Sequence, residues 1–330
     1  MSLSIIKPGM LDTIQDMGRY GYSDWGINTG GAMDRYAAQI ANLLVGNRPG
    51  EAVMEIHFPG PQILFEQNAL ICVTGGDFSA TLNDNPLPLW QPVAVRKNTV
   101  LHFPRLNRGA RSYLAVHGGF CIPKWLTSYS TNLKAVAGGW FGRPLKKGDE
   151  LSFKENTIYF AGLLREDNPT RVLPWRADIN KAYRHPHELF VLPGREWERL
   201  DAPSRVNFVE NNFIIHPSSD RMGYQLKGPA LELASQTELV SAGVNFGTIQ
   251  LLPEGQLIVL MADHQTTGGY PRIGHVISAH LNKLAQLRPS ETIQFKLTDI
   301  PMAEKLLMEQ RMDLQILQQS CLDRLNALVC

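Results

Sequence analysis

The side chains in this sequence that could do chemistry gather beside glycines. The clearest group follows Leu257 to Ala262, an apolar run with the length of a buried strand. Nine residues continue that run: Asp263, His264, Gln265, Thr266, Thr267, Gly268, Gly269, Tyr270 and Pro271. A core strand that ends in carboxylate, imidazole, amide and hydroxyl groups can present a binding site, because neighbouring glycines let a backbone approach a ligand closely. The same residue types also fit an ordinary turn behind a strand.

Two further groups combine arginine with carboxylates. Gln15 and Asp16 stand close to Arg19, and Asp220 directly precedes Arg221. A guanidinium beside carboxylates can hold an anionic substrate through paired hydrogen bonds. The same pattern fits a structural ion pair at a turn, so the residues alone leave both interpretations open.

Composition excludes several classes of protein. The chain has 330 residues with a formal net charge of +1 and no dense basic run, which gives no reason to expect nucleic acid as a partner. No apolar run reaches the roughly 18 residues of a membrane span, and the first residues lack the apolar core of a signal peptide. The four cysteines are far apart, which is typical of reduced thiols. We therefore expect a cytoplasmic protein that does not bind membranes.

Several common catalytic motifs are missing from the sequence. There is no GxxxxGK[ST] phosphate loop, no GxSxG nucleophile elbow and no HExxH zinc motif. No strand-linked GxGxxG predicts a dinucleotide site, and no Cys or His set has zinc-ligand spacing. Any site must therefore assemble from residues that are distant in the sequence.

The elements that would position these residues are mostly short strands. Apolar spacing from Met33 to Leu44 predicts a helix. Between Ala52 and Phe153, short strands alternate with turn residues, a pattern typical of a barrel or sandwich. After a linker at 166–184, the later expected elements are strands at Glu188–Leu192, Arg205–Phe208 and Phe213–Ile215, a helix at His275–Leu287, a strand at Thr292–Leu297 and a helix at Pro301–Val329. The expected domains are 1–165, 185–300 and a C-terminal helix at 301–330.

A faint internal repeat suggests two related halves. Thr13 to Gln15 precede a Thr-Gly-Gly at 29–31 and a helix, and Thr248 to Gln250 precede a Thr-Gly-Gly at 267–269 and a helix. Such a duplication predicts two similar β-rich domains whose loops line a shared pocket.

Many ordered blocks of this sequence resemble the biotin-dependent carboxyltransferase-like family, which is also called allophanate hydrolase subunit 2. The blocks run from about residue 5 to residue 295 and include 13–19, 30–34, 41–47, 117–120, 138–143, 148–149, 220–223, 247–250 and 263–271. One departure is visible. The family usually has Gly-Ser-Arg-Ser-Thr where this chain has Thr127-Ser128-Tyr129-Ser130-Thr131, so a tyrosine replaces a cation.

The resemblance implies a mainly β fold with two cyclophilin-like β-barrel domains, few helices and a C-terminal helical segment. It implies a subunit of an ATP-dependent 5-oxoprolinase, which opens 5-oxoproline to L-glutamate as an assembly of several subunits. The implied partners are a sister subunit of the allophanate hydrolase subunit 1 family and a third subunit, with ATP and Mg²⁺ used in the assembly. One alternative is a carboxyltransferase that moves a carboxyl group from carrier-bound biotin to an amide substrate. Another is a non-catalytic regulator of the sister subunit.

The chemistry types then assign roles to the candidates. The expected catalytic residues are Asp16, Arg19, Arg221 and Asp263, which would supply cationic donors or orient a nucleophile. The expected substrate-binding residues are Gln15, Gln250, Gln265, Thr266, Thr267, Gly268, Gly269 and Tyr270. The glutamines would read a substrate amide by hydrogen bonds. No residue is assigned as a metal ligand.

Overall fold

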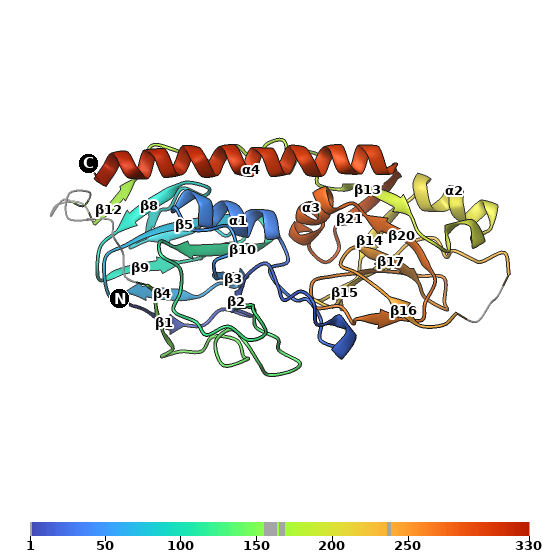
Figure 1. Cartoon of the computed structure of the whole chain (residues 1–330), viewed down its shortest axis with the longest axis horizontal. Coiled ribbons are helices and arrows are strands. Elements are labelled where there is room, and N and C mark those ends of the chain that lie inside the picture. The colour runs from blue at the N-terminus through green and yellow to red at the C-terminus, as the bar shows by residue number, and fades with distance from the viewer. Residues whose placement is uncertain (1, 155–163, 165–168, 236–238, 330) are drawn as a thin grey trace. The chain divides into compact units, whose positions relative to one another are not determined.

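The computed structural model describes residues 2–154, 164, 169–235 and 239–329 (Figure 1). The end of the expected first domain at 165, the linker residues 166–168 and Cys330 lie outside these residues. The chain forms two compact units that interleave along the sequence. The first unit contains 1–18, 34–178 and 312–330, and the second contains 19–33 and 179–311. The expected boundaries at 165 and 185 stay a prediction about independently folding domains.

The first unit contains two six-stranded sheets. One has the order β11 (Glu150–Ser152), β1 (Ser2–Lys7), β4 (Gln62–Phe65), β9 (Thr99–His102), β6 (Thr81–Leu82) and β7 (Asn85–Pro86). The other has the order β12 (Thr170–Val172), β8 (Pro92–Val95), β5 (Ala69–Asp77), β10 (Arg108–Val116), β3 (Val53–His57) and β2 (Thr13–Gln15). Alternate residues such as Leu3 and Ile5 are buried in a shared apolar core, as the period of two requires.

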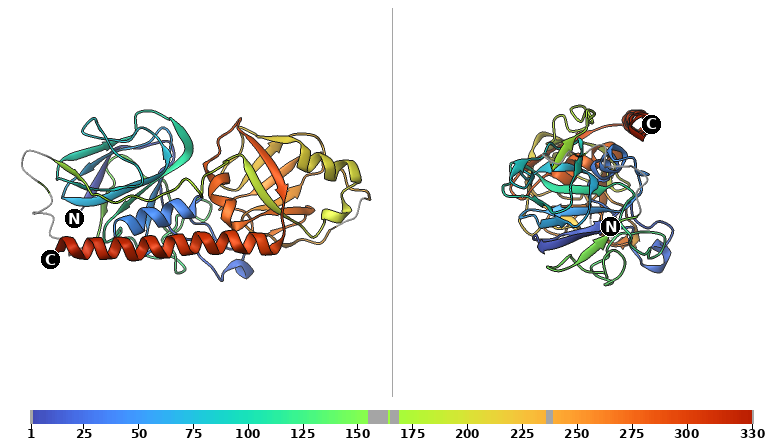
Figure 2. Two further views of the ribbon diagram at one scale, coloured as in Figure 1. Left: turned by 90° about the horizontal axis from the view of Figure 1, so that it is seen from above. Right: turned by 90° about the vertical axis from the view of Figure 1, so that its left-hand side faces the viewer.

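Helix α1 (Arg35–Leu44) packs against β5 and β10, and Figure 2 shows it in blue beside the strands of this unit. The helix starts where the apolar spacing predicted, because Asp34 caps it by accepting a hydrogen bond from the Ala37 amide at 2.9 Å. Thr74 of β5 donates to the Ala37 carbonyl at 2.8 Å. Tyr113 of β10 accepts a hydrogen bond from the Asp34 amide and donates one to Glu55, each at 2.8 Å. These buried bonds fix the helix on the sheet.

The second unit is built on a closed seven-stranded barrel. Its order is β13 (Glu188–Pro193), β20 (Arg272–Val276), β17 (Thr248–Leu251), β18 (Leu257–Leu260), β15 (Gly223–Lys227), β14 (Asn212–Ile215) and β21 (Thr292–Leu297). Phe208, Phe213 and Phe295 meet in its core, with the rings of Phe208 and Phe295 stacked 4.7 Å apart. A separate two-stranded sheet pairs β16 (Ala242–Gly243) with β19 (Thr267–Gly268).

Two expected elements of this unit are wrong. Residues 202–210 form helix α2 (Ala202–Glu210) where a strand at Arg205–Phe208 was expected. Asp201 caps this helix through the Ser204 amide, and a proline stands in its first turn, both of which favour a helix. The helix expected at His275–Leu287 begins later, as α3 (Leu281–Gln286), because Arg272–Val276 is needed as a barrel strand between β13 and β17.

The C-terminal helix α4 (Ile300–Val329) starts in the second unit, and its residues from Met312 belong to the first. In the first unit, Cys321 and Leu325 are buried, and Leu325 approaches Gly46 at the end of α1. This part of the helix therefore packs on the first unit through Cys321 and Leu325. No helix in the described part of the chain is both long and apolar enough to cross a membrane.

Candidate functional site

Arg221 and Asp263 form a two-pronged ion pair in the second unit. Arg221 Nε donates to Asp263 Oδ2 at 2.7 Å, and Nη2 donates to Oδ1 at 3.0 Å. The Asp263 amide also donates to the Arg221 carbonyl at 2.7 Å, so backbone and side chains join the same two residues. Arg221 is 6% exposed and its carboxylate partner 17% exposed, which removes both from bulk solvent. This geometry is strong and directional because the planar guanidinium matches the carboxylate.

A glycine turn from the N-terminal part of the chain completes this cluster. Arg221 Nη2 donates a further hydrogen bond to the Gly31 carbonyl at 2.7 Å. Gly30 has a φ of 61°, and a Cβ built there would lie 2.9 Å from Arg19 Nη1 and 3.7 Å from Asp263 Oδ1. A side chain at this position would therefore push on the Arg19 guanidinium. Three of the four expected catalytic residues, Arg19, Arg221 and Asp263, are neighbours around Gly30.

The loop after Asp263 carries six expected binding residues, and they do not converge on one point. Gln265, Thr267 and Tyr270 are exposed, whereas Thr266 and Gly268 are half-buried. Gly268 packs directly over Gln250, since a Cβ on it would lie 2.5 Å from Gln250 Nε2. A Cβ on Gly269 would meet Ser241 Oγ at 3.4 Å, which is close to ordinary contact. A side chain at 268 would therefore displace the Gln250 carboxamide, whereas a side chain at 269 would meet only Ser241 Oγ.

Gln15 and Gln250, the glutamines of the repeated tripeptide, share an unusual state. Each is 1% exposed, and the carboxamide oxygen of each has no hydrogen-bond partner among the described residues. Gln15 Nε2 donates to Thr13 Oγ1 at 3.0 Å, and Gln250 Nε2 donates to the Tyr270 carbonyl at 3.5 Å. An unmatched buried acceptor is costly, so each site favours a donor such as an amide N–H or a water.

Two histidines, His275 and His264, lie close to each other in the second unit. His275 approaches Thr248 Oγ1 at 3.4 Å through Nδ1. Burial, together with the neighbouring His264, lowers the pKa of His275 below its usual value. His264 is itself buried and its Nδ1 lies 2.6 Å from the Gln265 carbonyl. His275 was not among the expected site residues, and the sequence pattern placed it at the start of a helix although it lies in the barrel strand β20.

Asp16 and Gln15 belong to the first unit, and Asp16 organises a loop there. Its Oδ1 accepts hydrogen bonds from Gly18 N at 2.7 Å and from the hydroxyls of Ser128 and Ser130 at 2.6 Å. Its Oδ2 accepts from the Tyr129 amide at 2.6 Å. The carboxylate is 4% exposed and well supplied with donors. This arrangement favours a role for Asp16 in positioning the 127–131 loop.

That loop presents Tyr129 where the family usually has arginine. Lys124 Nζ lies 4.8 Å and Lys154 Nζ 5.7 Å from the centre of the Tyr129 ring. Lys154 also pairs with Glu51 at 2.8 Å, and a Cβ on Gly119 would lie 2.8 Å from that carboxylate. Cations therefore stand over the tyrosine ring at this point. Gly119 leaves the room that Glu51 needs in this packing.

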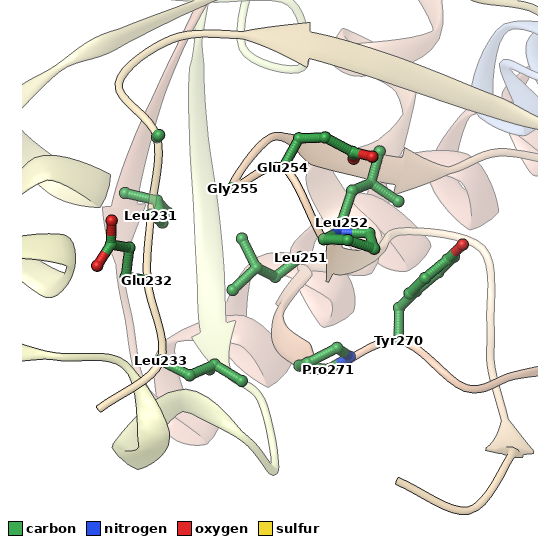
Figure 3. A pocket seen from close by; sticks show the side chains of 11 residues that line it. Leu231, Glu232, Leu233, Leu251, Leu252, Glu254, Gly255, Tyr270 and Pro271 are labelled. Atoms are coloured by element: carbon green, nitrogen blue, oxygen red, sulfur yellow. The ribbon is translucent and has the colours of Figure 1, made fainter. Parts of the chain in front are cut away.

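A groove of about 800 Å³ opens on the second unit beside Tyr270. Figure 3 shows Leu231 to Leu233 on one side of it, Tyr270 on the other and Leu251 with Leu252 between them. Glu232 and Glu254 add two carboxylates to its lining. The groove is thus lined by apolar side chains together with two carboxylates, and Tyr270 is the one expected site residue that lines it. Within the described residues, no group of three or more His, Cys, Asp or Glu side chains is placed to hold a metal ion.

The β-barrel unit and its buried arginine–aspartate cluster both lie within a stretch of the chain that matches a known protein family. The chain matches the family described as "Carboxyltransferase domain, subdomain A and B" over residues 25–297, and it belongs to that family. The match ends before α4.

Two curated relatives, each named as a subunit of 5-oxoprolinase, are similar over almost their whole length. The chain is 38% identical to the relative from Haemophilus influenzae over 294 residues, which are 89% of this chain and 90% of the relative. It is 36% identical to the relative from Escherichia coli over 312 residues, covering 94% and 95%. Among solved structures, the urea amidolyase of K. lactis superposes with a TM-score of 0.86 at 27% identity over 96% of this chain. The chain spans only 20% of that longer protein.

Proposed function

We propose that this chain is a subunit of an ATP-dependent 5-oxoprolinase, which opens 5-oxoproline to L-glutamate together with sister subunits. The observation that carries the proposal is the 38% identity to a relative named as a 5-oxoprolinase subunit, over about nine tenths of both chains. The proposed partners are a sister subunit of the allophanate hydrolase subunit 1 family and a third subunit.

The chemistry of the substrate fits the cluster around Gly30. The substrate 5-oxoproline carries a carboxylate and a five-membered cyclic amide. Three hydrogen bonds fix the Arg221 guanidinium, one of them to the Gly31 carbonyl, and Arg19 lies against the preceding residue, Gly30. Fixed guanidinium groups are suited to a substrate carboxylate or to charge that develops during the reaction. In this proposal Asp263 keeps Arg221 oriented.

The buried glutamine in the same unit fits the amide of the substrate. Gln250 Oε1 is an acceptor without a partner among the described residues, and an amide N–H supplies the donor it lacks. A site built to bond an N–H discriminates strongly against analogues without one, because its buried group is then left unpaired.

ATP with Mg²⁺ is a co-substrate of the assembly in this proposal. An amide oxygen is a poor leaving group, and phosphorylation of that oxygen would activate the ring for attack by water. Mg²⁺ bound to nucleotide takes most of its ligands from phosphates and water and requires only one or two carboxylates. We assign the nucleotide to the assembly as a whole and no residue of this chain to the metal.

A second candidate is a carboxyltransferase that takes a carboxyl group from carrier-bound biotin. The TM-score of 0.86 to a urea amidolyase favours it. One reconstitution separates the two candidates. The purified chain is mixed with the sister and third subunits, 5-oxoproline and Mg–ATP, and glutamate is measured. Release of glutamate that depends on this chain supports the first function. No glutamate, with carboxylation of urea only when a biotinylated carrier is added, supports the second.

A further inference from the structure

Helix α4 carries a row of large apolar side chains on its solvent side. Met308 is 62% exposed, Met312 57% and Ile316 63%. These three residues follow one another at intervals of four, so they lie side by side along one face of the helix. Cys321, which is buried, comes nine residues after Met312, or about two and a half turns, and therefore points to the opposite side. The helix thus has two apolar faces, of which one packs on the protein and the other is exposed.

The exposed row of Met308, Met312 and Ile316 is not needed to hold α4 in place. The opposite face already packs through Cys321 and Leu325, and the solvent side of an amphipathic helix is normally polar. A contiguous apolar surface that remains exposed on a folded protein marks a contact with another molecule. The exposed row is therefore a candidate interface.

The charged residues of α4 indicate which molecule this is. The helix contains seven of them: Glu304, Lys305, Glu309, Arg311, Asp313, Asp323 and Arg324. At about 100° per residue, Lys305 and Asp323 lie within about 20° of Met312 around the helix, whereas the other five lie at least about 60° away. The nearest of those five, Glu309, forms an ion pair with Lys181 at 2.8 Å. The exposed row is therefore flanked by one exposed cation at its start and one exposed anion at its end.

These positions are symmetric about Leu314. Lys305 lies nine residues before it and Asp323 nine residues after it, while Met312 and Ile316 lie two residues before and two after. A two-fold axis that crosses the helix at Leu314 places residues equally distant from it at the same level on two antiparallel copies. Lys305 of each copy then faces Asp323 of the other, and Met312 faces Ile316. In a parallel pair, like charges would meet at both ends, which is unfavourable.

We propose that the exposed row of α4 is an interface between two copies of this chain, whose α4 helices pack antiparallel about Leu314. The apolar row supplies the affinity, and the two ion pairs between Lys305 and Asp323 set the direction and register of the helices. A contact that is one helix wide is small for a protein interface, so the expected dimer is weak and reversible. The inference goes beyond the proposed function, because it needs neither a sister subunit nor a substrate.

The test measures the dissociation constant of the dimer for the full chain alone, by sedimentation equilibrium. Met312→Asp is expected to raise this constant at least about tenfold, because it buries a charge at the centre of the contact. Lys305→Asp and Asp323→Lys should each raise it as well, since each sets like charges against one another. The double variant restores opposite charges and should return to within about threefold of the wild-type constant. Arg311→Glu, a charge reversal about 100° from Met312 around the helix, is the control and keeps the wild-type value.

Three results would overturn the paired helices. A wild-type chain that stays monomeric up to the highest concentrations reached shows that the exposed row does not join two copies. A dimer whose dissociation constant is unchanged in Met312→Asp forms through another surface. A double charge variant that stays as weak as its single variants shows that Lys305 does not face Asp323. Thermal unfolding of each variant, expected at the wild-type temperature because all these positions are exposed, separates such results from misfolding.

Discussion

Arg221 and Asp263 lie 42 positions apart and are joined by two side-chain hydrogen bonds and one backbone hydrogen bond. Because of these bonds, the charge of each residue is balanced by the other. Removal of one partner leaves a buried charge unpaired, so Arg221→Ala is expected to destabilise the protein by about 3–5 kcal/mol. The measurement is urea unfolding, compared with Asp263→Asn and with the double variant. In the double variant the loss should be smaller than the sum of the single losses. Near-wild-type stability of Arg221→Ala would contradict the buried pair.

Gly268 is expected to matter for turnover through Gln250. In Gly268→Ala the new Cβ would lie 2.5 Å from Gln250 Nε2 and would displace the carboxamide. If Gln250 reads the substrate amide, kcat/KM of the reconstituted assembly should fall at least about tenfold, or 1.4 kcal/mol. Gly269→Ala is the matched control, because its Cβ would only touch Ser241 Oγ at 3.4 Å. Equal values of kcat/KM for the two variants would show that Gln250 has a structural role and does not bind the substrate amide.

Asp12 should make stability depend on pH. Burial raises the pKa of this carboxyl from 3.8 to about 7, although it accepts a hydrogen bond from Gly9 N. Between pH 4 and pH 7 the unfolded chain releases the proton first, so stability falls as pH rises and stays low above 7. Asp12→Asn removes this penalty and should stabilise the protein at pH 8 by up to about 4 kcal/mol. Urea unfolding from pH 4 to pH 8 measures it. The exposed Asp84→Asn should keep the wild-type slope.

Asp16 is expected to hold the 127–131 loop. Asp16→Ala removes the acceptor of two serine hydroxyls and two amides, so stability should fall by about 2–4 kcal/mol. Chemical unfolding gives the loss, and the exposed Asp24→Asn should show almost none. If Asp16 is instead a catalytic base, turnover should collapse in Asp16→Asn while stability stays at the wild-type value.

Sequence patterns predicted the regular elements with strong periodicity. The helix at Met33–Leu44 appears as α1, the final strand matches β21 and the long C-terminal segment is α4. The apolar run before Asp263 is β18. Short apolar runs were ambiguous, as α2 shows, because four residues fit either a strand or a helix, and the signals that favour the helix are the Asp201 cap and the proline in the first turn.

The sequence predicted which residue types form the candidate site, but it did not predict which residues contact each other there. Arginine next to carboxylates indicated an ion pair or an anion site, and Arg221 indeed pairs with a carboxylate, but with Asp263 and not with its neighbour Asp220. No local pattern places Gly31 against Arg221 or Ser128 against Asp16, since these contacts depend on how distant segments fold together. The left-handed backbones of Val136 and Phe141 had no sequence signal, because neither residue type favours that conformation.

Residues 19–33 lie near the start of the sequence, yet they belong to the second unit, which is formed mostly by residues 179–311. A fragment that begins at residue 179 would lack Met33 from its barrel core and the Gly31 carbonyl that receives Arg221. The second unit is therefore made of two separate segments of the sequence. Any attempt to express it separately, or to exchange it between relatives, must carry those fifteen residues along, for instance by circular permutation.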